Sequence, residues 1–321
     1  MPQRVEVVHV GSAARDVTDD DPRGWRLGGG VTYAALATAR LGLATAAIMG
    51  VDRAARGAHE LDRLRAAGVD LMLVDLPESP VFENRETSSG RVQTIVAVGV
   101  PLPVPPLPES WENAAAWSIV PVAGEVGDDW AAAIPDHAIV AVAWQGFLRE
   151  MRAGARVVRR APAASPLLAR ADLVGVSHLD VDHDTSLGEL SRFLHPGARL
   201  LVTQGGQGGL LVTTGDRDPV EVLRYLSTPT KREVDPTGAG DTFLAALLAV
   251  LVRGSVAGSP GRSLARALRF AAAAGSLAVE DVGLAGVPDR TAVLVRRASE
   301  RVRRAVVPNL SSQVGVDDPH Q

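Results

Sequence analysis

Short apolar runs alternate with longer stretches of helical apolar spacing along most of the chain, and each kind predicts one type of element. The short runs, rich in Val, Ile, Leu and Ala, predict strands. They cover residues 5–10, 44–50, 69–75, 117–122, 138–143, 173–176, 200–203 and 210–213. The longer stretches predict helices over residues 32–41, 53–68, 129–133, 238–254, 263–279 and 289–306. Strands that alternate with helices at short spacing predict an α/β fold, with a parallel sheet covered on both faces.

Four segments do not fit this alternation. Residues 13–27 are polar and predict irregular structure, whereas residues 81–100 form two extended runs around Ser88-Ser89-Gly90 and predict a hairpin. Residues 101–110 are rich in proline and predict a connector, and the polar tail 308–321 is expected to be disordered. Nothing in the pattern requires a second domain, so residues 1–307 are expected to form a single one.

Composition narrows the classes of function. The chain has 321 residues, 46% hydrophobic and 22% charged, as in a globular protein that can bury a large core. The net charge of -4 gives no general attraction to nucleic acid or to an anionic membrane. The N-terminal apolar run is too short for a signal peptide, and no apolar run is long enough to span a bilayer. The absence of cysteine excludes disulfides but favours no compartment strongly. From the missing signal peptide and membrane span, we expect a cytoplasmic protein without nucleic-acid or membrane partners.

The strongest chemical signal lies where the longest apolar helix is expected to begin. Gly238-Ala239-Gly240-Asp241 precedes the Ala/Leu-rich run, so unpaired amides and the helix dipole predict an anion site there. A carboxylate beside a bound phosphate is unusual unless it handles a proton, so Asp241 is a candidate general base. The alternative is a tight turn, with an acid that only suits the helix dipole. Lys231 is the single lysine and no Gly-Lys-Ser/Thr occurs, so a Walker-type loop is absent from this chain.

Asp235-Pro236-Thr237-Gly238-Ala239-Gly240-Asp241-Thr242-Phe243 resembles the C-terminal signature of the PfkB, or ribokinase-like, family of sugar and nucleoside kinases. Pro236 replaces the usual Thr of that signature. The resemblance covers roughly residues 5–300 and implies a three-layer α/β/α ribokinase-like fold with a central, mostly parallel sheet. It implies a small β lid formed by segments 12–27 and 81–100. It also implies that Asp241 is the base and that the amides of Gly238, Ala239 and Gly240 form an anion hole.

Gly28-Gly29-Gly30, followed by a helix, Leu41-Gly42 and a strand, resembles the N-terminal signature of the same family. Without that family, the segment would be a glycine-rich turn before a packed helix. Tyr33 stands where the family usually has an Asn that contacts a substrate hydroxyl, and together with Phe82-Glu83-Asn84 it resembles the subgroup that includes myo-inositol kinases. The substrate-binding residues implied in this way are Asp16, Gly29, Gly30, Tyr33, Asn84 and Gln93.

Two weaker signatures imply the nucleotide and metal sites. Gln204-Gly205-Gly206-Gln207-Gly208 resembles the family segment that lines the nucleotide, which implies that Thr203, Gly205, Gly208 and Thr237 bind ATP. Ser177 and Asp180 occupy the positions of the family's Asn-x-x-Glu, so Asp180 is implied to hold Mg²⁺ through water. The family also implies a monovalent cation such as K⁺, without identifying ligands here. Gln145 and Arg149 follow a predicted strand and either contact substrate or the transferred phosphate, or are ordinary surface residues.

The resemblance predicts an ATP-dependent kinase that phosphorylates a hydroxyl of a sugar or cyclitol, with a myo-inositol-like substrate favoured, and pairing of lids into a homodimer. A nucleoside kinase is the alternative within the family. A non-catalytic sugar- or nucleotide-binding protein on the same fold is an alternative of another class. A metal hydrolase remains as well, using the cluster His178, Asp180, Asp182, His183 and Asp184.

Overall fold

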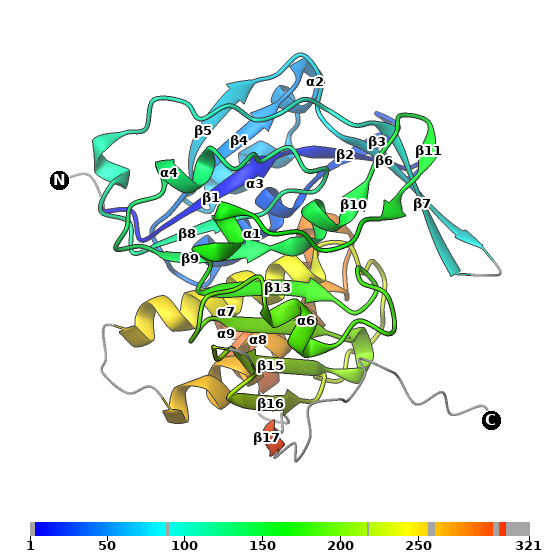
Figure 1. The fold of residues 1–321 in the computed structure, drawn as a ribbon. Coiled ribbons are helices and arrows are strands. Elements are labelled where there is room, and N and C mark those ends of the chain that lie inside the picture. Colours follow the sequence, from blue (N-terminus) through cyan, green and yellow to red (C-terminus); the bar gives the residue numbers. More distant parts are fainter. Residues whose placement is uncertain (1–3, 88–89, 217, 256–260, 298–301, 306–321) are drawn as a thin grey trace.

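The computed structural model describes residues 4–87, 90–216, 218–255, 261–297 and 302–305, and its centre is a ten-stranded sheet (Figure 1). The strand order is β17-β16-β15-β14-β13-β9-β8-β1-β4-β5. All pairs from β5 to β14 are parallel, whereas β14 to β17 pair antiparallel. The strands are β1 Val7–Ser12, β4 Thr45–Val51, β5 Asp70–Asp75, β8 Ala116–Ile119, β9 Ile139–Ala143, β13 Leu173–Ser177, β14 Arg199–Thr203, β15 Gly209–Thr213, β16 Glu221–Tyr225 and β17 Val302–Ala305.

Helices cover both faces of the sheet, which explains why its central strands read as continuous apolar runs. All six residues of β1 are buried: Val7 packs in the cluster with the longest helices, and Val8 and Val10 pack in a second cluster on the other face. The first cluster includes α1 Gly30–Arg40, α3 Glu60–Ala66, α7 Ala239–Ser255, α8 Gly261–Ala278 and α9 Arg290–Arg296. The second includes α4 Trp130–Ala133, α5 Pro166–Ala169 and α6 Leu187–Ser191. The predicted three-layer α/β/α fold is confirmed.

A second sheet of five strands stands at the end of the large sheet where β1 ends (Figure 1). Its order is β11-β7-β6-β2-β3, with β2 Ala14–Val17, β3 Trp25–Gly28, β6 Val81–Thr87, β7 Gly90–Ala97 and β11 Ala155–Arg156. The predicted hairpin is present as β6 and β7, which pair antiparallel. The prediction that residues 13–27 are irregular was wrong, because this segment forms β2 and β3. The charged residues of β2 hide any apolar alternation in the sequence, and β2 is formed by hydrogen bonding to β3 and β6.

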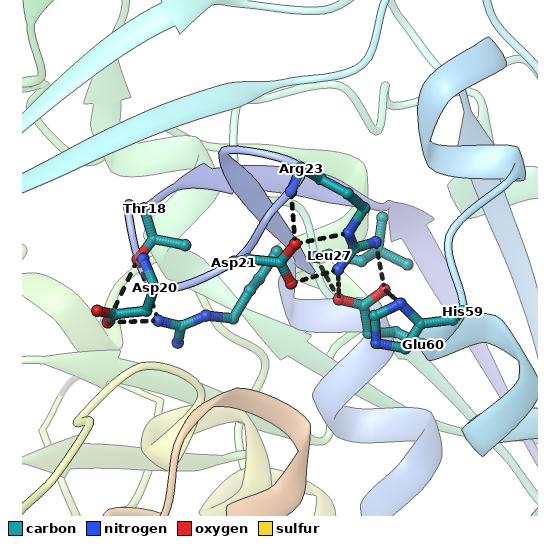
Figure 2. A network of polar contacts seen from close by, with 8 residues as sticks. Thr18, Asp20, Asp21, Arg23, Leu27, His59 and Glu60 are labelled. Atoms are coloured by element: carbon teal, nitrogen blue, oxygen red, sulfur yellow. Dashed lines mark hydrogen bonds and ion pairs between the residues drawn. The ribbon is translucent and has the colours of Figure 1, made fainter.

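Arg23, in the loop between β2 and β3, connects this loop to α3 (Figure 2). Its guanidinium lies between two carboxylates, donating to Asp21 at 2.9 Å and to Glu60, the first residue of α3, at 2.6 Å. The Glu60 carboxylate also accepts the Leu27 N–H at 3.1 Å, and the Arg23 guanidinium stacks 4.4 Å from the centre of the Trp25 ring. This partly buried network therefore holds β3, the strand that leads directly into the glycines before α1.

Three further boundaries differ from the sequence-based expectation. The helix expected over residues 53–68 is divided into α2 Arg53–Arg56 and α3, because Gly57 ends the first and Ala58 is buried between them. The last helix ends at Arg296, and Val302–Ala305 forms β17 instead of continuing it. Strand β16 was not predicted. It lies next to β15 and supplies the backbone hydrogen-bond partners of the edge strand β17, which the local sequence of β17 cannot reveal. The smaller elements are β10 Arg149–Glu150, β12 Val158–Arg159 and the 3₁₀ turns 109–111, 144–148, 205–207 and 283–286.

Several expectations fall on parts of the chain that the structure does not describe. The tail 308–321 and the hairpin tip Ser88-Ser89 lie outside the described residues. Within the described residues, no helix combines the length and the apolar character that crossing a bilayer requires.

Candidate functional site

One cleft of about 630 Å³ opens at the carboxyl ends of the parallel strands, between the two sheets and the start of α7. In open α/β sheets this is the edge at which ligands bind. Of the fifteen residues predicted to bind or react, all except Gly208 line it. They are Asp16, Gly29, Gly30, Tyr33, Asn84, Gln93, Asp180, Thr203, Gly205, Thr237, Gly238, Ala239, Gly240 and Asp241. Segments far apart in the sequence therefore meet at one place.

The turn before α7 is built around Asp235. Its carboxylate accepts the Thr237 N–H at 2.9 Å and the Gly283 N–H at 3.0 Å, which ties the turn to the 3₁₀ segment 283–286. Gly238 then adopts φ +77°, a left-handed conformation that favours glycine, and α7 begins at Ala239. The Ala239 N–H already donates to the Pro236 carbonyl at 3.3 Å. Gly238 and Gly240 are therefore the better candidates of the predicted three for donating to an anion.

Tyr33 lies beneath this turn. A Cβ on Gly238 would stand 2.1 Å from the Tyr33 ring, so the absence of a side chain lets the turn rest directly on that ring. Tyr33 is 3% exposed, and burial together with Asp16, Asp235 and Asp241 raises the pKa of its phenol. The sequence interpretation placed Tyr33 as a substrate contact. The structure adds that the aromatic ring of Tyr33 supports the turn before α7.

Asp241 follows in the first turn of α7 and faces α1. A Cβ on Gly30 would lie 2.9 Å from its Oδ1 and 3.0 Å from the Val120 carbonyl oxygen, so glycine at position 30 makes room for the carboxylate. Burial raises the pKa of Asp241 to about 6; Arg149 opposes this shift and Asp180 adds to it. The group is thus ionised at neutral pH, yet it holds a proton far more readily than an exposed carboxylate.

This raised pKa predicts a measurable cost of folding. The folded state holds the proton of Asp241 up to about pH 6, whereas the unfolded chain releases it near 3.8, so stability falls as the pH rises between these values. Above pH 6 the cost is fully present, on the order of 1–3 kcal/mol. Asp241→Asn is therefore expected to raise the melting temperature at pH 7.5 and to change it little near pH 3.5. An equal shift at both pH values in a thermal melting series would contradict the assigned burial.

The second sheet contributes three polar side chains to the cleft. Asp16 lies on β2, and Gly28 on the neighbouring strand makes room for it, because a Cβ there would come within 2.3 Å of the Asp16 carboxylate. Asn84 on β6 and Gln93 on β7 are paired residues, and the Gln93 amide donates to the Asn84 Oδ1 at 2.9 Å. This bond fixes the orientation of both amide groups. The NH₂ group of Asn84 and the carbonyl oxygen of Gln93 do not take part in it, so they offer one donor and one acceptor. The side chains also share the cleft with the apolar ring of Phe82.

The glycine-rich turn 204–208 forms the far end of the cleft. Thr203, Gly205 and Gly206 line it, whereas Gly208 does not. Gly208 has φ +88°, and a Cβ on it would meet the Tyr225 carbonyl oxygen at 2.2 Å, so its role is to let the turn pass over β16. Tyr225 also lines the cleft and packs against Phe243 of α7, with ring centres 5.1 Å apart. Sequence reasoning missed Tyr225 because it missed β16.

Asp180 joins the site through β13 and the turn after β9. Its Oδ2 accepts the Ser177 N–H and its Oδ1 accepts the Gln145 amide, both at 3.2 Å, while the Arg149 guanidinium lies 3.8 Å from Oδ1. The His178 Nδ1 pairs with the Thr203 carbonyl oxygen, and Asp182, His183 and Asp184 are exposed. The supposed metal cluster is therefore dispersed: among the residues that the structure describes, no three His, Asp or Glu side chains converge as metal ligands.

Comparison with known proteins agrees with this geometry. Residues 170–290 match the model of the pfkB family carbohydrate kinase. A 97-residue segment is 38% identical to a ribokinase of Arabidopsis thaliana, covering 30% of this chain and 23% of that protein. The chain spans about a quarter of the length of the curated relatives it matches.

Solved structures resemble the chain over nearly its whole length. One is a pyrophosphate-dependent kinase in the ribokinase family, complexed with a pyrophosphate analog and myo-inositol; the TM-score is 0.67 at 22% identity, over 90% of this chain and 99% of that chain. Another is Arabidopsis thaliana ribokinase complexed with ribose and ATP, with a TM-score of 0.63 at 21% identity, over 92% and 99% of the two chains. The chain thus has the ribokinase-like fold and carries, in residues 170–290, the pfkB carbohydrate kinase signature.

Proposed function

We propose that the protein is a kinase that transfers the γ-phosphoryl group of ATP to a hydroxyl of a sugar or cyclitol, with a polyol of the myo-inositol type favoured. The observation that carries the proposal is the meeting, in one cleft, of three parts that this reaction needs. A carboxylate whose pKa is raised to about 6 lies in the first turn of a helix, next to a glycine-rich anion turn and facing polar groups of a second sheet. Site chemistry and fold therefore support the same class of reaction.

In this proposal Asp241 accepts the proton of the acceptor hydroxyl while the oxygen attacks the terminal phosphorus atom. Its raised pKa suits that task, because a carboxylate with a pKa near the working pH takes up a proton more favourably while still being ionised. The amides of Gly238 and Gly240 stabilise the charge on the transferring group, aided by the dipole of α7. Burial at the foot of the cleft strengthens these interactions.

The size of the cleft, about 630 Å³, supports a nucleotide as donor. Besides the anion turn, it is lined by glycines and small polar residues, namely Gly205, Gly206, Thr228, Gly275 and Ser276, along which the rest of a nucleotide would lie. The structural similarity to a pyrophosphate-dependent kinase makes pyrophosphate the rival donor. Assays of phosphoryl transfer therefore need both donors.

The residues of the site fit Mg²⁺ only if water molecules lie between the ion and the protein. The described residues offer no cluster of three ligands, and both Asp180 oxygens already accept hydrogen bonds, so Asp180 would hold Mg²⁺ through water. Mg²⁺ commonly keeps several waters and binds through one or two carboxylates and the substrate's phosphates. When bound, it would neutralise charge on the donor phosphates. Dependence on K⁺ stays a prediction, with no residues assigned to it.

Recognition of the acceptor rests on the second sheet, which we propose acts as a lid. Asp16 accepts hydrogen bonds from hydroxyl groups, and the Asn84–Gln93 pair offers one donor and one acceptor to neighbouring hydroxyls, as a polyol ring presents them. Phe82 covers the apolar edge of such a ring. The myo-inositol bound to the related kinase supports this class of acceptor. Pairing of lids into a dimer and a cytoplasmic location stay predictions.

The test is release of ADP from Mg·ATP, or of phosphate from Mg·pyrophosphate, across cyclitols, hexoses, pentoses and nucleosides. We expect cyclitols to respond most strongly. A response confined to nucleosides would show that the protein is the alternative, a nucleoside kinase. Tight ligand binding without turnover on the whole panel would favour the non-catalytic binding protein.

A further inference from the structure

Negative charge dominates the cleft into which a polyphosphate must enter. Among the described residues that line it, Asp16, Asp180, Glu233 and Asp241 are acidic, and Arg149 is the one arginine or lysine. Four carboxylates around a donor that itself carries several negative charges would repel it. A single cation in such a place therefore has a large effect, and its position relative to the reacting groups decides what it does.

Arg149 is held close to those groups. It begins β10, immediately after the turn that follows β9, and its side chain is 14% exposed. Its guanidinium lies 3.8 Å from Asp180, whose carboxylate is in turn fixed by Gln145 and the Ser177 N–H. Its charge also acts on Asp241, where it opposes the rise in pKa caused by burial. A guanidinium has five N–H donors in a rigid fork, so it can face Asp180 and a phosphate together.

We propose that Arg149 binds the transferring phosphoryl group from the strand side of the cleft, while the first-turn amides of α7 bind it from the helix side. Asp180 and Gln145 then act as positioning residues that aim the guanidinium. This proposal rests on the proposed kinase function and adds to it the cation that the anion turn lacks. It differs from an ordinary surface ion pair, because the guanidinium would contact the terminal phosphate of the bound donor and interact more strongly as charge develops during transfer.

The test compares Arg149→Gln with a matched control, Arg159→Gln. These arginines face each other across the β10–β12 pair, but Arg159 is half exposed, contacts the Leu179 carbonyl and Asp182, and does not line the cleft. For Arg149→Gln we expect kcat to fall by roughly 10²–10³-fold, measured with whichever of ATP and pyrophosphate gives the higher wild-type turnover. Affinity for β,γ-imido-ATP should fall ~10-fold or more, as for loss of a charge-assisted contact, while ADP binding changes little. The control should match the wild-type protein in all three.

A second signature separates contact from mere structural support. Because Arg149 lowers the pKa of Asp241, its removal should move the acidic limb of the kcat/KM profile to higher pH, and Arg149→Lys should restore the limb but only part of kcat. Unchanged imido-ATP affinity in Arg149→Gln would overturn the proposal, whether or not an acceptor is known. Loss of ADP binding to the same extent would also overturn it, because it indicates a general defect of the cleft.

The outcomes also separate this proposal from the proposed function. If the wild-type protein binds imido-ATP in an Arg149-dependent manner but phosphorylates nothing on the panel, the phosphate contact stands and the kinase assignment fails. If turnover is normal in Arg149→Gln, the kinase assignment stands and the phosphate contact fails. Wild-type protein that binds neither imido-ATP nor pyrophosphate would overturn both.

Discussion

Asp241→Asn is expected to lower turnover by ~10² or more, with donor affinity kept within a few-fold, because the substitution removes a general base without removing volume. The side chain lies in the first turn of α7, against Gly30, and burial raises its pKa to about 6. The amide of Asn cannot accept the hydroxyl proton. Steady-state kinetics of the best donor and acceptor, with donor binding by calorimetry, measure both parts of the prediction.

A matched control is Asp129→Asn, which changes an exposed carboxylate just before α4, outside the cleft. It should leave turnover unchanged. The wild-type kcat/KM should also fall on acidification through about pH 6, because protonated Asp241 cannot act as a base. Asp241→Asn protein that keeps wild-type turnover would remove Asp241 from the mechanism.

Gly238→Ala is expected to abolish most activity and to destabilise the fold by about 2–4 kcal/mol. Two costs add: alanine must adopt φ +77°, and its Cβ would stand 2.1 Å from the buried Tyr33 ring. Either the turn or the ring has to move, which displaces the amides proposed to bind the transferring phosphoryl group, and loss of one such donor typically costs ~10²-fold or more in kcat. Chemical denaturation and steady-state kinetics measure the two effects.

Gly240→Ala in the same turn is the control. Gly240 lies in the first turn of α7 and does not have a positive φ. A Cβ on it would meet no heavy atom within 4 Å. The free energy of unfolding of the Gly240→Ala protein should rise by no more than ~1 kcal/mol, because alanine favours a helix more than glycine does. Equal destabilisation by the two substitutions would contradict the packing of Gly238 on Tyr33.

The sequence was sufficient to predict the layers of the fold and a set of candidate residues that the structure brings together in one cleft. Continuous apolar runs such as 5–10 and 138–143 predicted strands buried on both faces, and the sheet has them. The glycine-rich start of α7 predicted a turn that binds an anion, followed by Asp241, and the structure puts that turn and Asp241 in the cleft. These features depend on local patterns, which is why a single sequence reveals them.

Other features depend on partners far away in the chain. The charged strand β2 exists because β6 pairs with it, and β17 exists because β16 has an open edge. Nothing local shows that Tyr33 supports Gly238, or that Arg149 approaches Asp180. Gly208 fits the family segment by spacing, yet it shapes the turn without lining the cleft. Contacts between distant segments decide these roles.

The central claim is transfer of a phosphoryl group to a hydroxyl, and phosphorus-31 NMR of the reaction mixture tests it directly. Wild-type protein with myo-inositol, Mg²⁺ and either ATP or pyrophosphate should produce a phosphomonoester resonance that Asp241→Asn does not produce. The accompanying product should be ADP or phosphate in equal amount. A mixture in which only inorganic phosphate accumulates from ATP, with no phosphomonoester from myo-inositol or from any acceptor of the panel, would contradict the account.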